Sequence, residues 1–294
     1  MPVWNDIAAA ISTATGASFA IQSRAGVGGG CINAAYRIEG RGRRYFVKLN
    51  NAAKTAMFEA EAEGLREIGR TQTLRVPKPL CHGASAEYAW LVLEYLDTAR
   101  GNGAGMGALG AGLARLHATR APTFGWRRDN TIGATPQINT QNGDWITFWR
   151  DHRLGYQLRL AAANGHGGNL QKNGERLLAD MNTLFASHKP QPSLLHGDLW
   201  GGNIGFTSDG KPLVFDPAVY YGDREADLAM TELFGGFSAD FYAAYRECSP
   251  IDAGYSVRKH LYNLYHILNH LNLFGDGYLA QAENMMERLL AEMK

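Results

Sequence analysis

Three polar residues in the segment 193–218, SLLHGDLWGGNIGFTSDGKPLVFDPA, have the spacing of a phosphoryl-transfer site. Asn203 follows Asp198 by five residues, and Asp216 lies thirteen residues further on. Phosphoryl transfer needs one carboxylate that orients and deprotonates a hydroxyl, and oxygen ligands that hold magnesium on the phosphates. We therefore predict that Asp198 is the catalytic base and that Asn203 and Asp216 bind Mg2+ beside the phosphates of ATP.

The elements around these residues are short apolar runs. SLLH and LVFD are typical of buried strands, and IGFTSDGKP between them indicates a hairpin that turns at residues 208–210. The three polar residues are then expected on neighbouring loops at one end of a small sheet. In this arrangement His196 holds its loop by hydrogen bonds and does not transfer protons. The alternative for the carboxylates is that they cap helices at the surface.

Lys48 ends the apolar strand YFVKLN and is the predicted partner of the nucleotide phosphates. Its alternative role is that of a solvated charge at a strand edge. The helix predicted over residues 55–70 follows it and offers three glutamates. Glu61 lies at the inward margin of the apolar face of this helix. We therefore expect an ion pair between Glu61 and Lys48, with Glu59 and Glu63 in solvent.

A glycine run at residues 26–30, GVGGG, separates two predicted strands. A loop of this kind can lay its backbone N–H groups over phosphates. We predict that Gly28, Gly29 and Gly30 contact the nucleotide. Cys31 follows directly and would lie over the nucleotide, where its thiol is either redox-active or inert.

The apolar run WLVLEYL predicts a buried strand that ends in a hinge. We expect backbone groups of the hinge to read the adenine edge, and the hinge residues are Leu93, Glu94, Tyr95 and Leu96. Trp200 follows the predicted base closely and is expected to form one wall of the substrate pocket, because a sugar ring packs well on an aromatic face. The alternative for Trp200 is a hydrophobic plug.

Strands early in the chain and helices later indicate an α+β fold with two lobes, the order found in two-lobed kinases. The sequence predicts a helix over 3–15, strands over 17–50 with a tight turn at 40–42, a helix over 55–70, and later helices over 143–163, 170–188, 224–234, 238–247, 254–273 and 277–293. The boundary is expected near 96–105. It divides a small, β-rich, nucleotide-binding lobe (residues 1–96) from a larger, mostly helical lobe that carries catalysis and substrate binding (residues 97–294).

Two phosphate-binding motifs are matched only in part. Residues 205–212 approach G-x-x-x-x-G-K-[ST], but Pro212 replaces the hydroxyl residue that binds magnesium. Residues 105–110 match G-x-G-x-x-G, but no second strand ends in an acidic residue about 20 residues on. We interpret residues 105–110 as part of a flexible connection between the lobes that leads into a helix over GAGLARLHAT. The acidic residues of YYGDREADLAM are expected to favour a helix dipole and to support the catalytic loop.

The composition favours a globular protein of a reducing compartment. An apolar fraction of 45% and a charged fraction of 19% fit a packed core, and a net charge of +1 gives no reason to expect a nucleic-acid partner. We find no apolar run long enough for a bilayer and no basic start typical of a secretory signal. Three widely separated cysteines argue against a disulfide framework. We therefore predict a cytoplasmic protein without a membrane partner, either a monomer or a weak homodimer.

Several segments together resemble the fructosamine kinase (ketosamine kinase) family. This family lies within the aminoglycoside-phosphotransferase and choline-kinase group of protein-kinase-like folds. The segments are GGGCIN, MFEAEAEGL, FGWRRDNTIGATPQIN, NGDWITFWRDHRL, LLHGDLWGGNIGF, VFDPAVYYGDREADLAMTELFGGF and LYHILNHLNLFG. They cover almost the whole chain, and HGDLWGGN, FGGF and YHILNHLNLFG point to the family within the wider group.

The resemblance implies ATP-dependent phosphorylation of a sugar hydroxyl, O3, on a fructosamine, ribulosamine or erythrulosamine adduct of a free amine or a glycated protein. The phosphorylated adduct then decomposes and releases the amine, so the activity is deglycation. The resemblance also implies Asp198 as proton acceptor, Asn203 and Asp216 as magnesium ligands, and Lys48 with Glu61 as the ion pair of the nucleotide site. Two alternatives stay open: a kinase for an aminoglycoside, choline or homoserine, and a non-catalytic nucleotide-binding sensor that uses Cys31.

Overall fold

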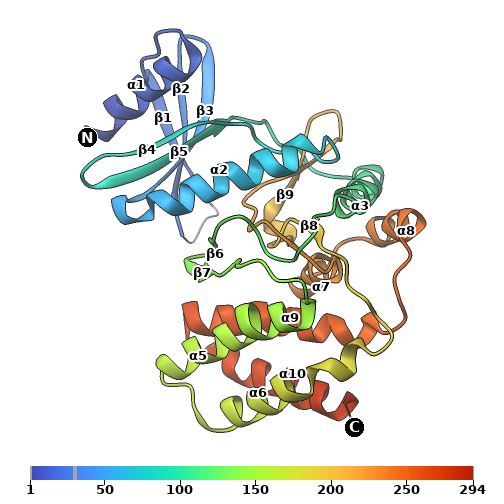
Figure 1. Cartoon of the computed structure of the whole chain (residues 1–294). Helices are drawn as coiled ribbons and strands as arrows, with labels where there is room; N and C mark the ends of the chain where they lie inside the picture. Colours follow the sequence, from blue (N-terminus) through green and yellow to red (C-terminus); the bar gives the residue numbers. More distant parts are fainter. Residues whose placement is uncertain (1, 29–31, 294) are drawn as a thin grey trace.

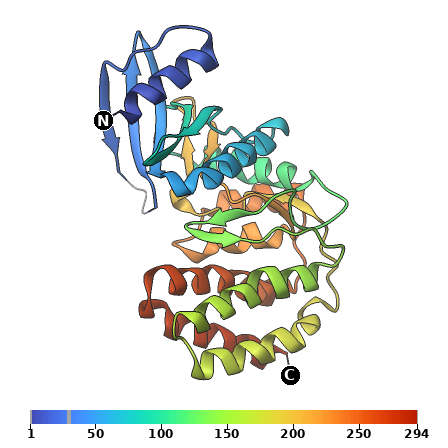
Figure 2. The ribbon, with the colours of Figure 1, turned by 60° about the vertical axis from the view of Figure 1, so that its left-hand side comes forward.

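The computed structural model describes residues 2–28 and 32–293. A five-stranded antiparallel sheet forms in the N-terminal part, and helices dominate the remainder (Figure 1). Figure 2 shows the sheet at one end of the molecule and the last helices at the other. The predicted α+β class is therefore confirmed, while the exact division at residue 96 stays a prediction.

The N-terminal sheet has the strand order β1-β2-β3-β5-β4. Its strands are β1 (Ser23–Val27), β2 (Ala34–Gly40), β3 (Arg43–Asn51), β4 (Pro79–Ala84) and β5 (Tyr88–Glu94). The predicted tight turn is confirmed, because Arg41 and Gly42 have φ angles of 51° and 72°, as a two-residue hairpin between twisted strands requires. The prediction of a first strand over SFAIQSR is wrong, since β1 begins only at Ser23 and continues into the glycine run.

Side chains alternate across β3, so each face of the sheet receives a different helix. Val47 and Leu49 pack under α1 (Val3–Thr15) in one apolar cluster. Lys48 lies between them in the sequence and therefore points to the opposite face, toward α2 (Thr55–Arg70). Both helices have the predicted bounds.

The helix predicted over GAGLARLHAT is present but begins earlier, at Gly103, so the interpretation of residues 105–110 as a flexible connection is wrong. α3 (Gly103–His117) begins there, and the side chain of Asn102 caps it by accepting a backbone N–H of the first turn at 2.9 Å. The glycines allow a close approach to α8 (Ala239–Cys248). A Cβ atom on Gly110 would lie 2.1 Å from the carbonyl oxygen of Phe241. Packing, rather than flexibility, accounts for these glycines.

The remaining helices fill the lower part of Figure 1. They are α4 (Trp145–Trp149), α5 (Gly155–Ala163), α6 (Gly168–Asp180), α7 (Glu225–Leu233), α9 (Tyr255–Phe274) and α10 (Leu279–Glu292). A π-helical turn over Arg150–Leu154 separates α4 from α5, which we expected to be one helix. A hairpin of β6 (Asn130–Ile132) and β7 (Thr135–Gln137), not predicted from the sequence, precedes them. Within the described residues, no helix combines the length and apolar character that a bilayer crossing needs.

The segment with the predicted catalytic residues forms two ribbons rather than one small sheet. β8 (Ser193–Leu195) pairs with β11 (Tyr220–Gly222), and β9 (Ile204–Phe206) pairs with β10 (Pro212–Val214). The predicted hairpin is thus confirmed, but SLLH and LVFD belong to different ribbons. Loops 196–203 and 215–219 both run from one ribbon to the other. They therefore lie side by side, and the N–H of Ala218 donates to the carbonyl oxygen of His196 at 2.9 Å.

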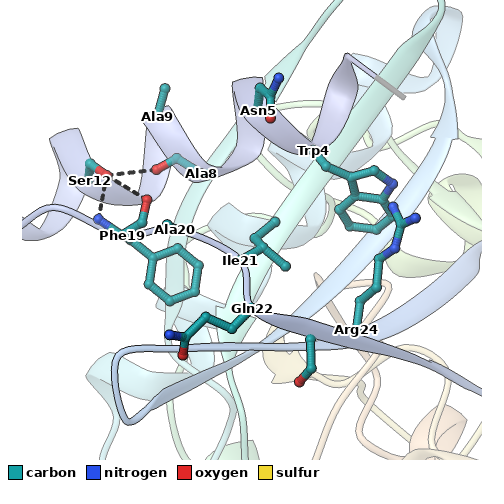
Figure 3. Close-up of a pocket in the computed structure, with 11 residues that line it drawn as sticks. Trp4, Asn5, Ala8, Ala9, Ser12, Phe19, Ala20, Ile21, Gln22 and Arg24 are labelled. Carbon is teal, nitrogen blue, oxygen red and sulfur yellow. Dashed lines mark hydrogen bonds between the residues drawn. The ribbon is translucent and has the colours of Figure 1, made fainter.

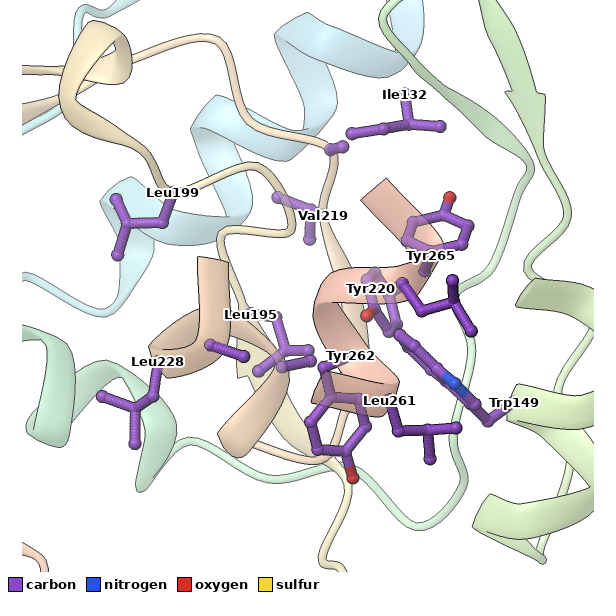
Figure 4. Close-up of a cluster of buried hydrophobic side chains, with 14 of the residues drawn as sticks. Ile132, Trp149, Leu195, Leu199, Val219, Tyr220, Leu228, Leu261, Tyr262 and Tyr265 are labelled. Carbon is purple, nitrogen blue, oxygen red and sulfur yellow. The ribbon is translucent and has the colours of Figure 1, made fainter. Parts of the chain in front are cut away.

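An aromatic core supports these loops (Figure 4). The ring of Trp149 lies 4.9 Å from that of Tyr262 and 5.5 Å from that of Tyr265, both on α9. Leu195 and Tyr220, from the two strands of one ribbon, are buried in the same cluster. The core therefore holds the β8/β11 ribbon on α9, and the ribbon positions the loops that leave it.

Candidate active site

Loop 196–203 is held in shape by its first residue. His196 is fully buried, its Nε2 lies 3.0 Å from the carbonyl oxygen of Phe215, and its Nδ1 accepts the backbone N–H of Asp198 at 3.3 Å. These partners require a neutral ring that carries its proton on Nε2. Burial lowers the pKa of His196, which agrees with the neutral form. The contacts are those of a scaffold residue, as the sequence predicted.

Asp227 of α7 binds the backbone of the same loop. Its carboxylate accepts the N–H groups of His196 at 2.7 Å and Gly197 at 2.8 Å, and lies 3.1 Å from Nε2 of His117. Burial opposes the charge of this carboxylate, but the contact with His117 and the other hydrogen bonds lower the pKa of Asp227. The predicted support of the catalytic loop by an acidic residue is therefore confirmed for Asp227.

Asp198 and Asn203 lie against each other within the loop. Nδ2 of Asn203 donates to the backbone oxygen of Asp198 at 2.8 Å and to its carboxylate at 3.1 Å. The amide oxygen of Asn203 is thereby left as a ligand suited to a hard cation. Burial, with a further contribution from the charge of Asp216, raises the pKa of Asp198 to about 7, against the effect of Asn203. A carboxyl group with that pKa can exchange a proton near neutral pH.

Lys48 is bound between two carboxylates. Its Nζ lies 2.6 Å from Oε1 of Glu61 and 2.7 Å from Oδ1 of Asp216. Burial disfavours the charge of the lysine, but the two carboxylates, Asp216 first, outweigh burial and raise the pKa of Lys48. The side chains of Lys48 and Glu61 are nearly buried, whereas that of Asp216 is 46% exposed and faces solvent. The ion pair expected between Lys48 and Glu61 is present.

The glycine run leaves the sheet in line with Lys48. Val27, the last residue of β1, pairs with Ala35 of β2, and Ala35 pairs with Lys48 of β3. Asn50 ties the returning chain to β3, because its Nδ2 donates to the carbonyl oxygen of Ile32 at 3.0 Å. Gly28 is the first residue of this connection. Gly29, Gly30 and Cys31 lie outside the described residues, and nucleotide contact by the run stays a prediction.

The predicted hinge spans the end of β5, the strand beside Lys48, because Leu93 and Glu94 are its last two residues. Leu93 is buried in the core, and Leu96 is half-buried. The carboxylate of Glu94 is bound by the guanidinium of Arg75 and accepts the N–H of Lys78 at 3.2 Å. The ring of Tyr95 lies 5.0 Å from the guanidinium carbon of Arg44. These four residues stay predictions for adenine binding.

Trp200 lies at the surface next to the predicted base. Its residue surface is 37% exposed, and its ring meets that of Phe234 edge to face at 6.2 Å. The ring lies over Gly202, where a Cβ would approach it to 2.3 Å. An exposed aromatic face beside Asp198 is suited to a sugar, and the role of Trp200 in substrate binding stays a prediction.

The expectation that Glu63 is solvated is wrong. Its carboxylate accepts from Arg127 at 2.7 Å and from Arg128 at 2.8 Å, and Arg128 also lies 3.4 Å from Glu59. The sequence held a signal for this contact, because Glu59, Glu63 and Glu67 recur every four residues and so share one helix face. The face needs a cationic partner from elsewhere in the chain, and sequence order does not identify it.

His188, Asp223 and Glu225 form a second acidic cluster whose ligand atoms lie within metal-binding distance of one another. Arg258 already donates two hydrogen bonds to Glu225, at 2.7 and 2.9 Å, and the hydroxyl of Tyr262 donates to Asp223 at 2.6 Å. The cluster is therefore satisfied by protein groups, and it fastens the start of α7 to α9.

A hollow beside the sheet lies away from these residues. It occupies about 600 Å³ between α1 and β1 and is lined by residues that include Trp4, Phe19 and Arg24 (Figure 3). The hydroxyl of Ser12 bridges its end, donating to the carbonyl oxygen of Ala8 at 2.8 Å. The residues described as lining it include no carboxylate, imidazole or thiol.

The α+β fold of this chain is that of solved phosphotransferase structures. An aminoglycoside phosphotransferase, APH(4)-Ia, shares the fold with a TM-score of 0.64 over 97% of this chain and 98% of that structure, at 15% identity. The crystal structure of a "putative fructosamine-3-kinase" from Haemophilus somnus superimposes with a TM-score of 0.90 at 29% identity, over 98% of this chain and 97% of that one.

Sequence comparison narrows the class. The model of the fructosamine kinase family matches residues 3–292. A probable ketoamine kinase of Synechocystis is 51% identical over 98% of this chain and 97% of its own length, and a chloroplastic protein-ribulosamine 3-kinase of Arabidopsis thaliana is 43% identical over 91% and 82%. The chain belongs to the fructosamine kinase family, and it is accordingly a kinase, a transferase of phosphoryl groups.

Proposed function

We propose that this protein transfers the γ-phosphoryl group of ATP to the O3 hydroxyl of a ketoamine. The observation that carries the proposal is the assembly of Lys48, Glu61 and Asp216 beside the Asp198 loop in a member of this family. The name of the Arabidopsis relative supports both position 3 of the sugar and a protein-bound substrate. The phosphorylated ketoamine then decomposes and releases the amine, so the reaction removes the sugar from the amine.

In this reaction Asp198 orients the sugar hydroxyl and accepts its proton. An O3–P bond forms while the bond from the γ-phosphorus to the β,γ-bridging oxygen breaks, and ADP leaves. Lys48 neutralises negative charge on the phosphates, and Glu61 keeps the lysine in place. The glycine run and the hinge, residues 28–30 and 93–96, hold the phosphates and the adenine.

Bound magnesium would neutralise the charge that develops on the phosphates during transfer. Asn203, through its amide oxygen, and Asp216, through its solvent-facing carboxylate, would hold it. The donor set fits, because both groups offer oxygen ligands and Asn203 is already oriented by Asp198.

Trp200 forms a wall of the sugar site. We retain the prediction of a cytoplasmic protein that is a monomer or a weak homodimer.

The test is ADP release by the purified protein with ribulosyl-lysine, fructosyl-lysine and an aminoglycoside in parallel. We expect turnover with the ketoamines and none with a 3-O-methyl ketoamine, which has no hydroxyl to phosphorylate. Turnover with the aminoglycoside alone would replace this function by the alternative kinase. Tight nucleotide binding without any turnover would instead support a non-catalytic sensor.

A further inference from the structure

Residues 125–139, which connect α3 to α4, pack directly on the chain that follows Asp216. We call this segment the strap. Gly125 and Tyr221 exchange two backbone hydrogen bonds, at 2.9 and 2.8 Å. Side-chain amides add two more, from Asn130 to the carbonyl oxygen of Val219 at 2.8 Å and from Gln137 to that of Ala218 at 3.0 Å. The strap is therefore anchored two to five residues after Asp216.

The same strap grips α2 through two adjacent arginines. Arg127 donates to Oε2 of Glu63 at 2.7 and 3.1 Å, and Arg128 donates to its Oε1 at 2.8 Å. Weaker contacts extend to the glutamates one turn away, with Arg127 at 3.5 Å from Glu67 and Arg128 at 3.4 Å from Glu59. The two views place β6 and β7 of the strap between α2 and α9 (Figures 1 and 2).

α2 also touches the chain after Asp216 directly. The hydroxyl of Tyr221 donates to Glu67 at 2.9 Å, and a Cβ on Gly64 would lie 3.1 Å from a methyl group of Val219. The acidic face of α2, the strap and residues 218–221 thus form one continuous set of contacts. Glu61, two residues before Glu63, lies on the other side of α2, where it meets Lys48.

These contacts affect the position of the two carboxylates that bind Lys48, because the strap joins the two segments that carry them. Glu61 is carried by α2, and Asp216 by the loop that leads into residues 218–221. A displacement of α2 by one or two ångströms would separate Glu61 from Lys48 without touching Asp216. The kinase reaction requires the Lys–Glu pair and the metal-binding aspartate to be in place together.

We propose that Arg127 and Arg128 are positioning residues that hold Glu61 and Asp216 in register on Lys48. The inference rests on the proposed function for its kinetic consequence and on the Lys48 geometry alone for its effect on nucleotide binding. Neither arginine contacts Lys48, Glu61 or Asp216 in the hydrogen bonds and ion pairs of the described chain. They act through Glu63, which lies two residues after Glu61 in α2.

The decisive variant is Arg127→Gln combined with Arg128→Gln. Single exposed ion pairs contribute little, so each single variant should be nearly neutral, whereas loss of the whole set should lower kcat/KM for ATP about tenfold. The affinity for a fluorescent ATP analogue should fall with it. Arg150→Gln is the matched control, because Arg150 is similarly exposed and paired with Asp151, and among the described residues it has no hydrogen bond or ion pair with α2. It should leave kcat, KM and nucleotide affinity unchanged.

Charge reversal separates positioning from simple stabilisation. Glu63→Arg should lower kcat/KM, and adding Arg127→Glu and Arg128→Glu should restore part of the loss, because opposite charges again meet at residue 63 while Glu59 and Glu67 lose their cationic partners. A structural role alone would lower the melting temperature of these variants and leave the kinetics of the folded fraction unchanged, which would overturn the inference. If the double glutamine variant does not fold, the variant Arg127→Lys with Arg128→Lys is used in its place. It retains both charges but loses the forked contacts of the guanidinium groups.

Failure of the proposed function is distinguishable in the same experiment. A parent protein that binds nucleotide but phosphorylates no ketoamine would contradict the function. The nucleotide affinities of the arginine and glutamate variants would still decide whether the strap positions the Lys48 site.

Discussion

Lys48 and Asp216 are 168 residues apart in the sequence, and their side chains form a 2.7 Å ion pair. The lysine belongs to the central strand of the N-terminal sheet, and the aspartate belongs to a loop between two ribbons of the helical part. The pair therefore connects the two regions at the point where we place the phosphates. Glu61 completes it from α2.

Removal of Lys48 should affect stability and activity together. Lys48→Met leaves Glu61 buried beside Asp216 without a cation, which should cost about 3 kcal/mol of unfolding free energy. Lys48→Met with Glu61→Leu should recover much of that stability but no activity. Urea unfolding measures the first effect and ADP release the second. Equal stability of the parent and the single variant would contradict the charged, buried pair.

Removal of the predicted base should affect catalysis alone. Asp198→Ala should lower kcat by about 100-fold or more, because general-base catalysis contributes that much. Nucleotide affinity should persist, since Lys48 and Asp216 remain. The readouts are steady-state ADP release and titration with a fluorescent ATP analogue. Normal turnover in this variant would remove Asp198 from the mechanism.

Two glycines of the same loop should differ sharply in tolerance. Gly197 has a φ of +83°, and a Cβ there would lie 2.1 Å from the carbonyl oxygen of Ala218, so Gly197→Ala should destabilise the protein by about 2 kcal/mol or more and inactivate it. Gly201→Ala meets no atom within 4 Å and is the matched control. Thermal unfolding and kcat measured on both variants check the prediction. Equal effects would show that the backbone of Gly197 is not constrained.

Buried His266 should make the protein sensitive to acid. Burial lowers the pKa of His266 to about 3, well below the value of about 6.5 for an unfolded chain. The unfolded state therefore binds the proton first, and stability falls as pH decreases below about 6.5, by up to about 1.4 kcal/mol per pH unit. His266→Gln should remove this part of the slope between pH 6.5 and 4.5 in urea unfolding. His82→Gln, at an exposed strand position, should keep it.

The local elements of this protein are determined largely by sequence. Alternation in YFVKLN, the acid-rich amphipathic helix after it and the turn glycines of SDGK act over a few residues, and they give β3, α2 and the β9/β10 hairpin where we predicted them. The types and spacing of Asp198, Asn203 and Asp216 likewise limit the chemistry to oxygen-ligand and proton-acceptor roles. The helical glycines of α3 are the exception, because their packing partner lies on α8.

Only the tertiary structure decided which distant groups meet. Sequence order does not indicate that β8 pairs with β11, which of the three acidic residues at the start of α7 binds the backbone of the Asp198 loop, or that Arg127 and Arg128 neutralise Glu63. The reason is physical. Propensity and periodicity act along the chain, whereas a buried charge selects its partner by the three-dimensional packing that removes both from water. That packing brings the carboxylates of Glu61 and Asp216 to Lys48, so the site forms only when the tertiary structure is complete.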